Sequence, residues 1–151
     1  MWITNPERDR IKFVQELKGV NGYSYVYTKR VRLEKGKPEL VLEHSLKNTG
    51  KRVIETEVYN HDFCVIDGTP TGPALSVPFP FQPKAVQDLK GAAETQGNKF
   101  VYLRELKAGN HDSVATYLEG YGDTAHDFDI SVENSATGAG VQETGDRPIS
   151  K

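Results

Sequence analysis

The feature that most constrains this chain is a strict alternation of side-chain type in its first third. Over residues 23–33, a tyrosine or an aliphatic residue stands at nearly every second position, and Leu40, Leu42, His44 and Leu46 repeat the pattern over residues 39–46. Because neighbouring side chains of an extended strand point to opposite faces, this period of two predicts two half-buried strands. The Gly- and Pro-containing segment 34–38 predicts a turn between them.

The composition of the whole chain also favours strands. β-branched and aromatic residues, which prefer strands, are abundant, whereas Leu and Ala are few. The 14 glycines and 8 prolines punctuate the 151 residues at short intervals, a pattern typical of an all-β sandwich or barrel. We therefore expect an all-β fold, a single antiparallel β-sandwich domain over residues 1–151, with no strong amphipathic helix.

The later part of the chain offers weaker strand signals. Prolines at 78, 80 and 83 exclude a central strand between those positions. Loops are expected at 67–73 and 85–98, where Gly, Pro and polar residues dominate. Further strands are expected at 52–59, 63–66, 99–106, 113–118, 126–133 and 139–144.

Charge and cysteine content exclude several classes of function. The chain has 19 Lys and Arg against 21 Asp and Glu, a formal net charge of −2, which argues against binding nucleic acid by overall charge. The lone Cys64 excludes an intramolecular disulfide and a cysteine zinc cluster. No apolar stretch reaches the length of a membrane span, and residues 1–10 lack the apolar core of a signal peptide. We expect no nucleic-acid or membrane partner, and a cytoplasmic location is slightly favoured.

The four histidines are the natural candidates for proton transfer near neutral pH. His61 follows the end of a predicted strand, where polar groups often meet ligands, although a turn histidine bonded to the backbone is an equal reading. His44 lies among leucines on its strand, which favours a core or interface histidine, and His111 lies in a turn-like segment. No pair of histidines has metal-binding spacing, so neither a metal site nor a cofactor is expected.

Two short motifs then follow one another in a suggestive order. Asn60-His61-x-Phe63 comes first, and Pro70-Thr71-Gly72 precedes the aromatic segment 77–81. This order resembles the galactose mutarotase-like (aldose 1-epimerase) superfamily. The resemblance implies that the sandwich is part of that family's supersandwich.

The chain also departs from that family's pattern. Only residues 62–69 separate the two motifs, where the family usually carries another strand pair, and family members are about twice as long. The Glu that serves as the family's catalytic base has no assignable counterpart. The chain therefore resembles a truncated or divergent short member.

What the resemblance implies is the interconversion of sugar anomers. That reaction needs a base for the anomeric hydroxyl proton and an acid for the ring oxygen. By its motif, His61 would bind the sugar and take part in catalysis, and His126, preferred over His111, would be the second histidine. Their neighbours in the motif, Tyr59, Asn60 and Phe63, are then expected to contact a small-molecule sugar.

Two classes of function remain open from the sequence. The first is a carbohydrate-binding sandwich with aldose 1-epimerase-type activity, in which tyrosines 23, 25 and 27 would stack on sugar rings instead of filling a core. The second is a non-catalytic structural or protein-interaction sandwich, which the missing base Glu favours. Exposed sheet edges would then favour a homo-oligomer.

Overall fold

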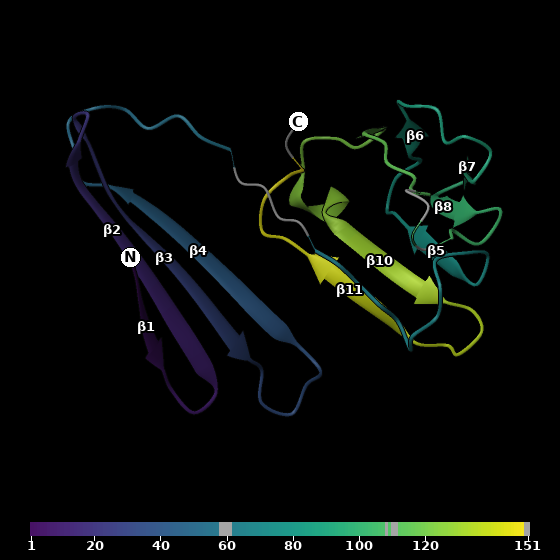
Figure 1. Ribbon diagram of the computed structural model, residues 1–151, viewed down its shortest axis with the longest axis horizontal. Coiled ribbons are helices and arrows are strands. Elements are labelled where there is room, and N and C mark those ends of the chain that lie inside the picture. The colour runs from purple at the N-terminus through teal and green to yellow at the C-terminus, as the bar shows by residue number, and fades with distance from the viewer. Residues whose placement is uncertain (58–61, 108, 110–111, 150–151) are drawn as a thin grey trace. The chain divides into compact units, whose positions relative to one another are not determined.

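A computed structural model describes residues 1–57, 62–107, 109 and 112–149 of the chain (Figure 1). Over these residues the fold is all-β: every strand pair is antiparallel and no α-helix occurs, as the sequence predicts. No helix among them has the length and apolar character needed to cross a membrane. The chain divides into two compact units, Met1–Asn60 and His61–Lys151. The stacking of sheets into one sandwich domain stays a prediction.

The first unit is a four-stranded meander. Its strands are β1 (Trp2–Pro6), β2 (Arg10–Val20), β3 (Tyr23–Leu33) and β4 (Leu40–Asn48), in the order β1-β2-β3-β4. Asn21 and Gly22, with φ of 49° and 81°, form the two-residue loop between β2 and β3. Two successive positive φ angles are what the tight hairpin turn demands, and Asn-Gly adopts them readily.

The strand register separates the side chains of this sheet into two faces. Phe13 pairs with Lys29 and Lys29 with His44, so these residues point to one side, together with every second residue of each strand. We call this side the apolar face; its large side chains are Trp2, Ile11, Phe13, Leu17, Tyr25, Tyr27, Val31, Leu33, Leu40, Leu42, His44 and Leu46.

The opposite side of the sheet, the charged face, carries ion pairs. Arg30 Nη1 lies 2.6 Å from Glu43 Oε2, and Lys18 Nζ lies 3.1 Å from Glu16 Oε1. Figure 1 shows the four strands as one layer, and residues 1–57 contribute no further strand. None of these residues is fully buried. Within its own described residues, the first unit therefore leaves its apolar face without a second layer.

The second unit is built on a five-stranded sheet. It comprises β5 (Leu75–Pro78), β7 (Ala93–Gln96), β8 (Lys99–Tyr102), β10 (Asp129–Asn134) and β11 (Gly140–Thr144), in the order β11-β10-β5-β8-β7. A separate pair joins β6 (Lys84–Ala85) to β9 (Leu118–Glu119), and a 3-10 turn, η1, spans Ala125–Asp127.

The described buried core belongs to this second unit. Phe79, Ala93 and Phe100 form its centre, packed against partly buried side chains that include Phe81, Tyr102 and Ile130. Asn134 is the most deeply buried polar residue: its Nδ2 donates to Thr69 Oγ1 at 2.8 Å, and its Oδ1 accepts from the Ala136 N–H at 3.0 Å. Both ends of its amide are thus satisfied, as burial requires.

Three strand predictions are wrong in the described residues. Residues 52–57, 63–66 and 113–117 are irregular. After β4, the N–H groups of Thr49 and Gly50 both donate to the carbonyl of Ser24, near the beginning of β3. These hydrogen bonds turn the chain across that part of β3. Arg52 then lies over the Tyr23 ring at 4.5 Å, so the chain does not continue as a hairpin.

Other boundaries also differ from prediction, and the expected strand 99–106 ends at Tyr102. The expected loop 85–98 contains β7, because Gly97, with φ of 58°, closes a two-residue hairpin with β8. The expected strand 126–133 begins only at Asp129, because η1 precedes it. By contrast, β5 ends at Pro78, where the run of prolines predicts that regular structure stops.

Candidate functional site

The residues singled out by the family resemblance are only partly described. Tyr59, Asn60 and His61 lie outside the described residues, so their predicted roles stay predictions. Phe63 lies in the irregular segment that follows and is 84% exposed. His126 is exposed within η1. The candidate residues described here are thus surface side chains, and their contact with a sugar is still a prediction.

The structure adds a carboxyl pair that involves Asp62, the residue directly after the Asn-His motif in the sequence. Asp62, the residue after His61, shares a side-chain hydrogen bond with Glu143 of β11. Burial raises the pKa of Glu143, and the charge of Asp62 and their hydrogen bond raise it further. A carboxyl group with a raised pKa stays protonated to a higher pH than usual, which makes it a candidate acid or base.

Sequence reasoning missed Glu143 because nothing near it in the chain marks it. Glu143 lies directly opposite Ile130 on the neighbouring strand, so the two side chains point to the same side of the sheet. Ile130 packs against the core on that side. An acidic residue at an inward position of a strand was the one available signal. Its partner Asp62 lies far away in sequence, and only the fold brings the two carboxyls together.

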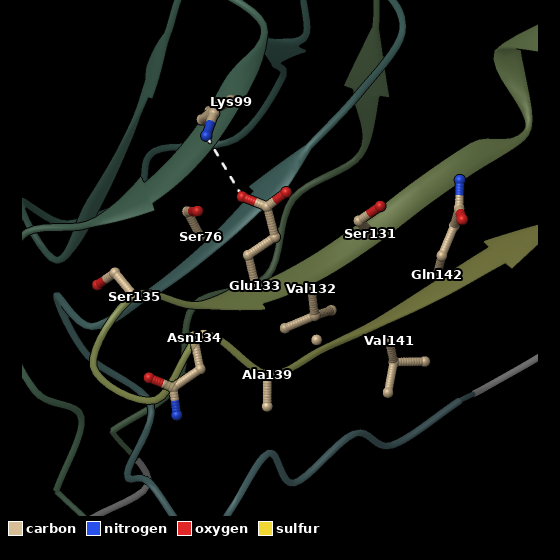
Figure 2. A pocket seen from close by; sticks show the side chains of 12 residues that line it. Ser76, Lys99, Ser131, Val132, Glu133, Asn134, Ser135, Ala139, Val141 and Gln142 are labelled. Carbon is tan, nitrogen blue, oxygen red and sulfur yellow. Dashed lines mark hydrogen bonds and ion pairs between the residues drawn. The ribbon is translucent and has the colours of Figure 1, made fainter. Parts of the chain in front are cut away.

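A shallow depression of about 530 Å³ lies over β10 and β11 (Figure 2). Its lining is mostly small and polar, including Ser76, Ser131 and Gln142, and it contains no aromatic ring. Lys99 Nζ lies 3.4 Å from Glu133 Oε2 across it, as Figure 2 shows, so these two charges balance each other. The depression lacks both a stacking surface and a group set up for proton transfer.

The apolar face of the first unit holds a denser constellation. Trp2 packs edge-on against Phe13 and Tyr27, with ring centroids 6.4 and 5.6 Å apart, and Tyr27 stacks on His44 at 6.0 Å. We call these four residues the aromatic platform. They come from β1, β2, β3 and β4, and only the register of the meander brings them together.

His44 is the polar centre of the aromatic platform. The Tyr27 hydroxyl and His44 Nδ1 are hydrogen-bonded at 2.5 Å. Its other ring nitrogen, Nε2, is shielded from solvent and has no hydrogen-bond partner among the described residues. Burial, and secondarily the charge of Lys29, lowers the pKa of His44 below 6.5, so the ring is neutral at pH 7. The predicted interface histidine is therefore only half satisfied.

Further polar groups border the aromatic platform. Gln15 pairs in register with Trp2 on one side and Tyr27 on the other, and its Oε1 accepts a long hydrogen bond, 3.5 Å, from the Tyr25 hydroxyl. Lys29 lies between Phe13 and His44 in the next row. Beyond this row the face becomes aliphatic, through residues such as Val31 and Leu42.

No group of three His, Cys, Asp or Glu side chains able to hold a metal ion is found in the described part of the chain. Searches against family models, curated proteins and solved structures found no match for this chain. What the chain binds is therefore inferred from its own residues.

The carboxyl pair predicts a specific pH dependence of stability. Because the folded-state pKa of Glu143 is raised above 4.5, the folded protein holds this proton more tightly than the unfolded chain. Its contribution is fully present below pH 4.5 and is lost as pH rises through the folded pKa. Glu143→Gln, which cannot ionise, should therefore raise the thermal unfolding midpoint relative to wild type at pH 7 and change it little at pH 4.

Thermal scans by circular dichroism at the two pH values make this measurement. Glu119→Gln, at an exposed glutamate of the same unit, is the matched control and should give equal shifts at both pH values. Equal shifts for Glu143→Gln as well would contradict the assignment.

Proposed function

We propose that this chain recognises carbohydrate through the aromatic platform of the β1–β4 sheet. The observation that carries the proposal is the gathering of Trp2, Tyr27 and His44 on one open sheet face. The C–H face of a sugar ring packs on aromatic rings, and a few placed polar groups fix its hydroxyls.

The surroundings of the platform support the same ligand. Trp2 is 44% exposed, so its ring is open to a ligand. Gln15 lies on the same face, and its amide can both donate and accept hydrogen bonds. Apolar rings interleaved with neutral polar groups suit a sugar better than a purely apolar ligand.

Anomer interconversion is the activity that we propose for the motif at residues 59–63. The order of the Asn-His and Pro-Thr-Gly motifs supports it. The Asp62–Glu143 carboxyl pair supports it too, because Asp62 directly follows His61 in the sequence. In this proposal His61 and His126 act on the sugar, and Tyr59, Asn60 and Phe63 contact it. Glu143, with Asp62 beside it, is the candidate for the base that the sequence alone left unassigned.

Removing the indole ring of Trp2 should weaken sugar binding. Trp2→Ala is expected to weaken binding about tenfold, because one aromatic contact is worth roughly 1.5 kcal/mol. The measurement is saturation-transfer NMR over a panel of common aldoses with the full chain. Ile3→Ala, the next residue of β1 but on the opposite face, is the matched control and should bind like wild type. Equal binding by both variants would place sugar contact elsewhere.

The proposed activity has a separate readout. Exchange NMR on the same sugars should show faster α–β interconversion with the wild-type chain. His61→Ala should abolish this acceleration while leaving the circular dichroism spectrum unchanged, because its role is in proton transfer. His111→Ala is the control histidine variant and should retain the acceleration. Unfolding of His61→Ala would make this histidine structural, and an unchanged rate would exclude it from the reaction.

The aliphatic end of the apolar face favours a second candidate function, self-association. Leu33, Leu40 and Leu42 are exposed there, and a sheet normally buries such a face against another layer. Four strands about 4.8 Å apart and nine residues about 3.4 Å each cover roughly 600 Å². That approaches the ~800 Å² that each partner buries in a standard interface. We propose that a second copy of this chain packs face to face on the apolar face. The alternative expected from the sequence is association through the sheet edges, which β1 and β4 form in this unit.

Self-association is tested by sedimentation velocity over a range of protein concentrations. A face-to-face dimer should dissociate in Leu42→Lys, which puts a charge on the apolar face, and persist in Ser45→Lys, which puts it on the charged face of the same strand. A monomer at all concentrations would exclude this candidate, and a dimer that tolerates Leu42→Lys would point to the sheet edges.

A further inference from the structure

Lys29 stands out on the apolar face. It lies on β3 in the same row as Phe13 and His44, and it is half-buried. All the remaining residues at the paired positions of the apolar face are uncharged. Among its paired positions, the apolar face therefore carries one lysine, which lies next to the aromatic platform.

The basic residues nearby on the charged face have acidic partners. Arg30 pairs with Glu43, and Arg32 pairs with Glu34 and reaches Glu43. Lys29 makes no ion pair with any residue that the structure describes. A lysine without an acidic partner on a largely apolar surface favours an anion that reaches the same surface.

The neighbouring histidine does not compete for that anion. His44 is neutral at pH 7, because burial and the charge of Lys29 lower its pKa. Its ring is held by the Tyr27 hydroxyl at Nδ1. Among the described residues of this sheet face, Lys29 is thus the cation that an anionic group on a platform-bound ligand would meet.

We propose that the ligand of the aromatic platform is an acidic sugar, a uronate, whose ring packs on Trp2 and Tyr27 while its carboxylate pairs with Lys29. This inference rests on the proposed carbohydrate recognition and names its substrate class. Lys29 lies two residues from Tyr27 on the same face, about 7 Å along the strand, which is the scale of one sugar ring with its carboxylate. A carboxylate and an ammonium make a charge-assisted hydrogen bond stronger than a neutral one.

The test compares glucuronate with glucose, which differ only in the carboxylate, by saturation-transfer and titration NMR. The wild-type chain should bind glucuronate about tenfold more tightly than glucose. Lys29→Met keeps the apolar stem and removes the charge, so it should bring glucuronate down to the affinity of glucose and leave glucose unchanged. Lys29→Arg should keep the preference, and circular dichroism checks that each variant is folded.

Lys47→Met is the matched control, since Lys47 is a lysine of β4 that points to the charged face. It should leave the preference for glucuronate intact. If Lys29→Met and Lys47→Met had equal effects, the preference for glucuronate would arise from the overall charge of the protein and not from Lys29, and the inference would be overturned. Equal wild-type binding of the two sugars would also overturn it, while the proposed carbohydrate recognition would stand. Contact with neither sugar would overturn both.

Discussion

The arrangement of the first unit depends on cross-strand pairing that sorts its side chains onto two faces. Because β1, β2, β3 and β4 are all antiparallel neighbours, residues directly opposite each other share a side of the sheet. A shift of one residue in a single strand would move its large side chains to the charged face. The register therefore decides that Trp2, Phe13, Tyr27 and His44 meet, although they are far apart in sequence.

The two units distribute their apolar surface differently. The second unit buries Phe79, Ala93 and Phe100 in a core of its own and satisfies its buried amide at Asn134. The first unit presents its aromatic and aliphatic side chains on one open face of a single described layer. An extended apolar surface of this kind usually marks a binding site. Its aromatic end with polar groups carries the sugar proposal, and its aliphatic end carries the self-association proposal, in which a face-to-face dimer would cover both ends.

The sequence predicts β3 and β4 because their signals are local, whereas it marks neither β1 nor β2 as a strand. The alternation at residues 23–33 coincides with β3, and the Gly- and Pro-containing segment 34–38 falls in the turn before β4. The short strands of the second unit were harder to predict, because tertiary pairing decides them. The mostly polar β7 forms where Gly97 closes a hairpin, whereas the more apolar residues 63–66 form no strand in the described part of the chain.

The candidate site was less predictable still. The tyrosines and His44 could be assigned to one strand face each, but their meeting with Trp2 requires the register of three strand pairs. The pairing of Asp62 with Glu143 is equally non-local. The sequence thus identifies individual candidate residues, whereas it does not predict which of them come into contact in the folded chain.

The central claim is that the aromatic platform binds sugar, and the chain's single tryptophan lies in that platform. The most direct measurement is therefore the intrinsic fluorescence of Trp2 during titration of the wild-type chain with oligosaccharides of neutral and acidic sugars. The account predicts a saturable shift of the emission to shorter wavelength, as the half-exposed indole becomes covered. Emission that stays unchanged while NMR reports sugar contact would contradict it, because the sugar would then bind away from Trp2.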